Sequence, residues 1–188
     1  MIPPQLLSVD PFVLQELLAD FQAIATTAWF PKHHLLHEEG NICNHLYFVE
    51  EGIVHSYYHK DGKPITAHFA TEGQAVSAID SYLAQKRSRY NLQVLEPALV
   101  HSLHRKEVEA LLAQKPAYEK YVRLFLEQIY LELAERVEAL LFHTAKERYQ
   151  QLLEQHPTLC QRVNLGYMAS YLGITPETLS RIRAQATL

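Results

Sequence analysis

The spacing of glycines in the first half of the chain constrains the fold more than any other feature. They follow one another at intervals of 10 to 12 residues and are Gly40, Gly52, Gly62 and Gly73. The β-rich runs between them, from Trp29 to Leu103, are LYFV, IVHSYYH, ITAHFA, YNLQVL and ALVHSL. Short strands with turns at this spacing predict an antiparallel barrel or sandwich, which we call the roll. Asp61-Gly62 is a strong signal for a two-residue hairpin.

Helical patterns flank this β region, so we expect an α+β fold. Residues 10–28 carry apolar side chains near a 3.6-residue period and predict a short helix; they are Phe12, Val13, Leu17, Leu18, Phe21 and Ile24. After Arg105 the pattern becomes helical again, and no glycine or proline interrupts it from Pro116 to about Glu154. This predicts one helix that is long for a globular protein.

An apolar seam runs along the long helix. Its members follow a 4-3-4-3-4 spacing and are Leu126, Tyr130, Leu133, Val137, Leu140 and Thr144. This is the a/d pattern of a coiled coil and predicts a homodimer interface. The alternative is a helix packed only on its own roll. A second stripe can face the roll while the first faces a partner, which favours the dimer; it consists of Leu124, Leu131 and Leu141.

The last segment has the pattern of a helix-turn-helix, LGYMASYLGITPETLSRIR, beginning at Leu165. Ala169 is a small residue at the fifth position, where two helices approach, and Gly173 stands at the ninth, where a left-handed turn is needed. Thr175 and Pro176 suit an N-cap and a first helical position. The inward positions are apolar: Met168, Leu172, Ile174, Leu179 and Ile182. An ordinary helical hairpin is the alternative. We expect three domains: a roll at 1–115, a dimerisation helix at 116–144 and a DNA-binding unit at 145–188.

The second helix of such a motif enters the major groove of DNA. There Arg181 can pair with guanine and Glu177 can accept from the cytosine amino group. The chain is acidic, but residues 145–188 carry a net charge of +2 and the remainder −6. We expect Arg181 and Arg183 to be free on the groove side, and Lys146 and Arg162 are candidates for phosphate contacts.

The order of these parts resembles the Crp/Fnr family of bacterial transcription regulators. HLYFVEEGIVHSYYHKDGK is similar to the family's β-roll, and ITPETLSRI to its recognition helix, so the resemblance implies that the roll is jelly-roll-like. The resemblance implies base-reading roles for Glu177 and Arg181. It also implies neighbouring polar contacts by Thr175, Thr178 and Ser180. The implied partners are double-stranded DNA and a second copy, with RNA polymerase as a further candidate. Pro176 replaces a common Arg. Only AQATL follows Arg183, so we expect part of the family's β-hairpin wing to be absent.

Family members that bind cyclic nucleotides hold the ribose with a Gly-Glu pair and the phosphate with a later Arg-Ser/Thr-Ala. The corresponding segment here is GQAVSAIDSYLAQKRSRYNLQ, in which Gly73 aligns with the glycine and Gln74 with the Glu. Arg87-Ser88 follows after more residues than in the family pattern. Arg89 replaces the small residue. The resemblance therefore implies no response to cAMP. A small anionic or apolar effector, a pocket without a ligand, and a solvated basic loop all stay open, and no cofactor is expected.

Other classes of function lack a motif. The histidines His33, His34 and His37 cluster, but the chain has no H-x-H, so we expect no metal site. Cys43 and Cys160 form no disulfide framework, and no nucleophile motif appears, so we expect no enzyme. MIPPQLLSVDPF does not resemble a signal peptide, and no apolar window of about 18 residues occurs. We expect a cytoplasmic protein without membrane contact. Two hypotheses remain: a DNA-binding transcription regulator, or a ligand- or partner-binding roll whose terminal helices are structural.

Overall fold

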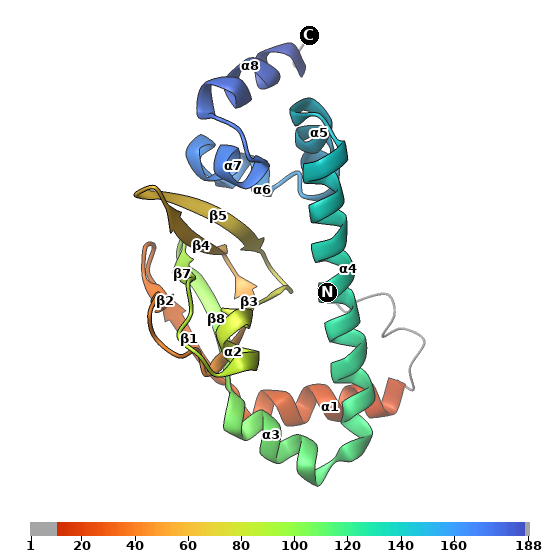
Figure 1. The fold of residues 1–188 in the computed structure, drawn as a ribbon. Helices are drawn as coiled ribbons and strands as arrows, with labels where there is room; N and C mark the ends of the chain where they lie inside the picture. The colour runs from red at the N-terminus through yellow and green to blue at the C-terminus, as the bar shows by residue number, and fades with distance from the viewer. Residues whose placement is uncertain (1–10, 187–188) are drawn as a thin grey trace.

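A computed structural model describes residues 11–186 of the chain. The N-terminal stretch that lacks a signal-peptide pattern lies mostly outside these residues, as do the last two residues of AQATL. The β region forms two antiparallel four-stranded sheets (Figure 1). One has the strand order β1 (Thr26–Phe30), β8 (Ala98–His104), β3 (His45–Glu51), β6 (Ala75–Val76). The other has the order β2 (Leu35–His37), β7 (Asn91–Val94), β4 (Val54–Lys60), β5 (Lys63–Ala70). The predicted α+β fold with an antiparallel roll is confirmed.

The roll is filled by side chains that alternate inward along the strands. Its buried core includes Tyr47, Val49, Val54, Leu92, Val94 and Val100. The β4–β5 hairpin turns at Asp61 and Gly62, whose φ angles are 52° and 73°. Positive φ at both central residues is the geometry of a type I′ turn, which matches the twist of the two strands. The hairpin signal in the sequence is therefore confirmed.

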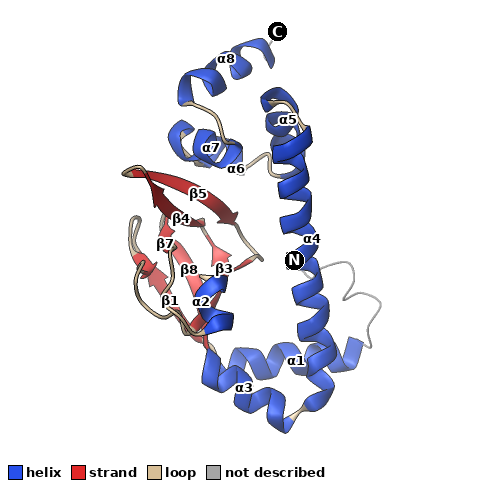
Figure 2. Cartoon of the chain, in the orientation of Figure 1, coloured by secondary structure: helices blue, strands red, loops and turns tan. Residues whose placement is uncertain are grey.

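Helices pack below and beside the roll (Figure 2). They are α1 (Pro11–Ile24), α2 (Ile79–Ala84), α3 (Arg105–Gln114), η2 (Pro116–Tyr118) and α4 (Glu119–Phe142). Leu14 and Leu17 of α1 are buried against Tyr118 and Tyr121. The first helix is shorter than predicted because β1 begins at Thr26. This cluster anchors the start of α4, which then runs alongside the roll (Figure 1).

The long helix ends earlier than the sequence pattern predicted. α4 stops at Phe142, and α5 (Ala145–Gln155) begins after Thr144. The Thr144 hydroxyl accepts a hydrogen bond from the Glu147 amide at 3.3 Å, and the Glu147 carboxylate accepts one from the Thr144 amide at 2.7 Å. This capping box starts a new helix. The prediction of one helix to about Glu154 is wrong, and Thr144 caps α5 instead of extending the seam.

The chain ends in α5 and three further helices, α6 (Leu159–Arg162), α7 (Leu165–Leu172) and α8 (Pro176–Ala186). Their core contains Tyr149, Leu152, Met168, Ala169, Leu172, Leu179 and Ile182. The same core includes Ile53, Phe69 and Leu95 of the roll. The roll and the terminal helices are therefore joined by one hydrophobic core. Among the described residues, no helix is long and apolar enough to cross a bilayer.

Candidate DNA-binding surface and ligand loop

Helices α7 and α8 are joined by a tight turn at Gly173, as the predicted helix-turn-helix requires. Gly173 ends α7 in the left-handed conformation, with φ 69° and ψ 32°. The amide of Ile174 then bonds back to the Ala169 carbonyl at 3.0 Å, which closes the turn. Ala169 is fully buried between the helices. Both special positions of the sequence motif thus have the expected conformation and packing.

Helix α8 shows a polar face to solvent. The Thr175 hydroxyl accepts a hydrogen bond from the Thr178 amide at 3.3 Å and so caps the helix. Leu179 and Ile182 are buried beneath it. The predicted DNA-contacting side chains are exposed except Thr178, which is half-buried; they are Thr175, Glu177, Thr178, Ser180 and Arg181. α8 lies at the end of the molecule far from α1 and α3 (Figure 1).

Glu177 is ionised near neutral pH. Its pKa lies below the usual value because the carboxylate accepts hydrogen bonds from its own backbone amide and from the Thr175 hydroxyl, and because Arg181 lies near. Arg181 Nη2 is 3.4 Å from the Thr178 hydroxyl. A carboxylate and a guanidinium are thus exposed together in the first turns of α8, the part of a recognition helix that meets base edges.

Arg183 does not share this face. Its Nη2 donates to the Cys160 carbonyl at 3.1 Å and contacts the Met168 sulfur at 3.2 Å. Its guanidinium also lies over the Tyr149 ring. The expectation that Arg183 is free on the groove side is therefore wrong. The long side chain folds back because its donors find a carbonyl and an aromatic face within the helical unit.

Arg162 links the terminal helices to the roll. It donates to Glu72 at 2.6 and 3.1 Å and to Glu96 at 3.1 Å. These hydrogen bonds from Arg162 lower the pKa of Glu72 to about 2. The positive charge of Arg162 is balanced by two carboxylates of the roll. Arg162 therefore stabilises the interface between the roll and the terminal helices. The other candidate for a phosphate contact, Lys146, is exposed on α5.

Further contacts join α7 to the β4–β5 hairpin. The Thr66 amide donates to the Ser170 hydroxyl at 3.1 Å. The Phe69 and Tyr171 ring centroids lie 5.1 Å apart, and the guanidinium of Arg136 on α4 lies over the Tyr171 ring, 3.7 Å from its centroid. Arg136 also donates to the Tyr171 carbonyl at 2.9 Å. Sequence reasoning missed this interface, since strand periodicity does not reveal what covers the outer face of a sheet.

A buried histidine lies in this interface. His55 is 1% exposed, and its ring centroid is 4.7 Å from that of Tyr167 on α7. Burial lowers the pKa of His55 to about 4, so the ring is neutral at physiological pH. Its nitrogens lie near the Thr66 hydroxyl and the Gln93 side-chain oxygen, at 3.3 and 3.4 Å. A neutral, hydrogen-bonded imidazole here fits an apolar interface.

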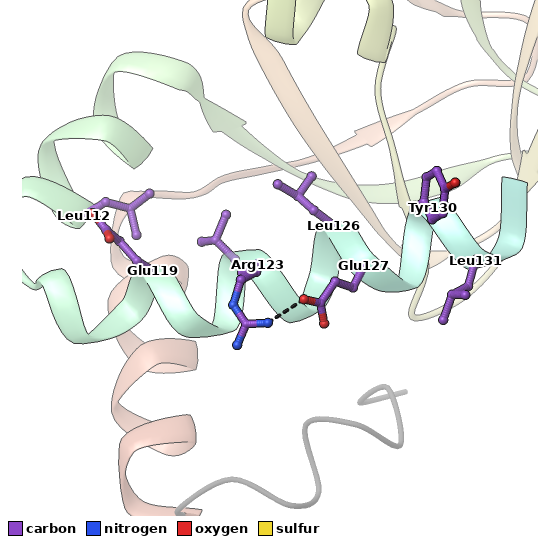
Figure 3. A pocket seen from close by; sticks show the side chains of 8 residues that line it. Leu112, Glu119, Arg123, Leu126, Glu127, Tyr130 and Leu131 are labelled. Carbon is purple, nitrogen blue, oxygen red and sulfur yellow. Dashed lines mark hydrogen bonds and ion pairs between the residues drawn. The ribbon is translucent and has the colours of Figure 1, made fainter. Parts of the chain in front are cut away.

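The predicted seam of α4 is exposed to solvent. Its exposed fractions are 40% for Leu126, 70% for Tyr130, 58% for Leu133, 47% for Val137 and 43% for Leu140. Leu126 and Tyr130 also line a groove of about 670 Å³ at the start of the helix (Figure 3). Of the second stripe, Leu124 packs in the α1 cluster, but Leu131 and Leu141 are exposed. The expectation that this stripe faces the roll is wrong for these two residues.

The candidate ligand residues lie in two turns, and each makes contacts within the roll. Gly73 adopts φ 78° and donates to the Val49 carbonyl at 2.8 Å. The Gln74 side-chain oxygen accepts from the amide and hydroxyl of Thr71 at 2.9 and 3.0 Å. Arg87 donates to the Gly40 carbonyl at 2.8 Å. Ser88 is buried, and its hydroxyl donates to Asp80 at 3.0 Å. Sequence reasoning did not single out Asp80.

Metal-ligating side chains do not converge: within residues 11–186, no group of three His, Cys, Asp or Glu is arranged to hold a metal ion. Of the three neighbouring histidines of the sequence, His33 lies in the turn between β1 and β2, His34 follows this turn, and His37 is the last residue of β2. His33 has φ 72° there, so the backbone itself turns sharply at the first of them. The three residues form no such group.

Comparison with known proteins identifies a matching domain family and similar solved structures. The family model of the cyclic nucleotide-binding domain matches residues 27–115. A search of curated protein sequences finds no match. Among solved structures, FixK2 from Bradyrhizobium japonicum superposes with a TM-score of 0.74 at 19% identity, over 86% of this chain and 84% of that one.

Two other solved structures span most of the chain. The regulator CLP of Xanthomonas campestris, described as a c-di-GMP responsive global regulator, has a TM-score of 0.70 at 15% identity, with 92% and 91% coverage. The catabolite activator protein of Thermus thermophilus has a TM-score of 0.58 at 19% identity, with 98% and 86% coverage. Residues 27–115 thus match the cyclic nucleotide-binding domain family. The chain as a whole has the fold of the Crp/Fnr regulators, which confirms the resemblance seen in its sequence.

Proposed function

We propose that the protein is a homodimeric, sequence-specific DNA-binding transcription regulator that does not respond to cAMP. The observation that carries the proposal is the exposed face of α8. Glu177 and Arg181 stand on a helix whose start is capped by Thr175 and whose other side is buried. Similarity in fold to proteins described as a global regulator and an activator supports the same role.

The dimer is supported by the seam on α4. Five large apolar side chains, each at least 40% exposed, follow one another along a single helix face. Contiguous exposed apolar surface of this kind marks an association site. A parallel pairing of two α4 helices would bury the seam and present two α8 helices. In regulators that bind palindromes, such helices lie about 34 Å apart, one turn of B-DNA.

The contacts of the ligand residues argue against cAMP. Gln74 is neutral, and its side-chain oxygen is engaged by Thr71. A neutral amide also lacks the charge-assisted strength with which a carboxylate binds a ribose hydroxyl. Arg87 donates to a backbone carbonyl instead of an anion. An interaction with RNA polymerase and a cytoplasmic location stay predictions.

Selection of bound sequences from a random duplex pool tests the DNA-binding function. We expect a palindromic site with a G·C pair in each half, and affinity that falls as salt rises. If the terminal helices are only structural, as in a ligand- or partner-binding roll, no sequence is enriched.

Substitution of Arg181 then tests its role. Arg181→Ala is expected to cost about 1–3 kcal/mol at the selected site and to relax the preference for the guanine. Lys106→Ala, which removes an exposed charge from α3 at the opposite end of the molecule, serves as the control and is expected to change neither. Equal losses on the selected duplex and on one altered at the guanine would make Arg181 a phosphate contact and refute its base-reading role.

A further inference from the structure

The basic loop Lys86-Arg87-Ser88-Arg89 binds the carboxylate of Asp80, a residue of α2. The Ser88 hydroxyl lies 3.0 Å from Asp80 Oδ1, and the Arg89 amide donates to Asp80 Oδ2 at 3.4 Å. The Ser88 oxygen also accepts a hydrogen bond from the Tyr90 amide at 2.9 Å. Its proton is therefore directed at the carboxylate. Both oxygens of Asp80 are bound by the loop.

The two donors of the loop, the Ser88 hydroxyl and the Arg89 amide, are positioned by hydrogen bonds between neighbouring segments. The Ser88 backbone pairs with residues 40 and 41: its amide donates to the Asn41 carbonyl, and its carbonyl accepts from the Gly40 amide, each at 2.9 Å. The Ser81 hydroxyl of α2 accepts from the Cys43 amide at 2.9 Å and donates to the Lys86 carbonyl. Ser81 and Ser88 are 0% and 3% exposed. These bonds fix the loop and α2 relative to the roll, so the hydroxyl and the amide point at the same place whatever anion is there.

The charges of the loop also suit an anion. Lys86, Arg87 and Arg89 are exposed and carry three positive charges within four residues. A hydroxyl and a backbone amide converging beside such charges form a receptor for an oxyanion. This loop lies in the part of the chain that matches the cyclic nucleotide-binding domain, whose ligands carry a phosphate.

We propose that Asp80 is the built-in anion of this loop and occupies it in place of an anionic effector. With Asp80 removed, the vacated loop binds a small oxyanion, such as phosphate or a carboxylate. For the wild-type protein the consequence, which rests on the proposed function, is that DNA binding needs no added effector.

Chemical rescue of an Asp80→Ala variant tests the assignment. Removal of the carboxylate leaves a hydroxyl and an amide without their acceptor, and we expect the melting temperature to fall by about 4–10 °C. Millimolar acetate or phosphate, compared with chloride at matched ionic strength, is expected to raise the melting temperature of the variant more than that of the wild type. Calorimetry with inorganic phosphate is expected to show binding to the variant and none to the wild type.

Two further variants keep the result interpretable. Asp80→Asn keeps one acceptor oxygen and fills the space, so we expect a smaller loss of stability and no rescue; it decides the matter if the alanine variant does not fold. Glu154→Ala removes an exposed carboxylate from α5 and is expected to show no loss and no rescue. The proposal is overturned if oxyanions raise the melting temperatures of Asp80→Ala and wild type equally, or if Asp80→Asn melts as the wild type does.

Measurements of DNA binding distinguish the proposed role of Asp80 from the proposed function of the protein. Dialysed wild-type protein is expected to bind its selected duplex without any addition, and Asp80→Ala to bind it more weakly until phosphate is supplied. Rescue of the melting temperature without DNA binding by either protein would overturn the proposed function and leave the role of Asp80 intact. DNA binding by the wild type only after addition of an effector would overturn the role of Asp80 as its substitute.

Discussion

Replacement of Phe69 by alanine should uncouple the terminal helices from the roll. Phe69 is 6% exposed and lies between His55 of the roll, at a ring distance of 6.2 Å, and Tyr171 of α7, at 5.1 Å. Loss of a buried phenylalanine costs about 3–5 kcal/mol, because the cavity adds to the lost transfer energy. At about 2–4 °C per kcal/mol for a chain of this size, the melting temperature should fall by about 6–20 °C.

The assay is urea unfolding followed by hydrogen exchange of the α7 amides. Since the wild type shares one core between the two parts, we expect a single transition and equal protection of α7 and β5. In Phe69→Ala the α7 amides should lose protection before those of β3. Val100→Ala, in the core of the roll alone, should destabilise the protein without this separation. If both variants keep α7 and the roll equally protected, the shared core does not couple them and the reasoning is wrong.

Two other predictions concern the dimer and the buried histidine. Leu133→Glu with Val137→Glu should convert a dimer to a monomer, whereas Glu138→Gln on the same helix should not; light scattering that finds only monomeric wild type at micromolar concentration contradicts the interface. His55 has a folded pKa of about 4, below the ordinary 6.5, so the unfolded chain binds its proton first as the pH falls. The free energy of unfolding should therefore drop between pH 6.5 and pH 4, by at most about 1.4 kcal/mol per pH unit from this group. Urea midpoints at pH 7 and pH 5 should show a smaller drop for His55→Gln than for the wild type.

The fold was predictable because its signals are local. The hairpin turn needs only that the neighbouring residues Asp61 and Gly62 adopt positive φ. The turn after α7 needs positive φ at one residue, Gly173. The break between α4 and α5 was also readable, since Thr144 and Glu147 have capping-box spacing. The prediction of one long helix rested on the absence of glycine and proline and used Thr144 only as a seam residue, but a capping box can begin a new helix without either.

The contacts that join distant segments were not predictable. The Arg162 guanidinium meets Glu72, a residue 90 positions earlier, and nothing in either neighbourhood marks the pair. Asp80 and Ser88 are close in sequence, yet their contact depends on α2 turning the chain back. Such partners are set by the packing of whole elements, and a single sequence carries no periodic trace of them.

The number of basic side chains that are free to contact phosphates determines how steeply the affinity for DNA falls as the salt concentration rises. Three of the five basic residues in 145–188 are engaged within the molecule: Arg148 with the Leu172 carbonyl at 3.0 Å, Arg162 with two carboxylates, and Arg183 with the Cys160 carbonyl. Lys146 and Arg181 remain exposed.

A dimer then offers about four such charges to phosphates and bases, and each phosphate contact contributes about −0.9 to the slope of log affinity against log salt. We therefore expect a slope no steeper than about −4. Lys146→Ala should flatten it by about two, one contact in each protomer, and lower affinity for all duplexes alike. A wild-type slope near −8, unchanged in Lys146→Ala, would mean that basic side chains of the roll reach the DNA, because the terminal helices cannot supply so many contacts while Arg148, Arg162 and Arg183 keep their present partners.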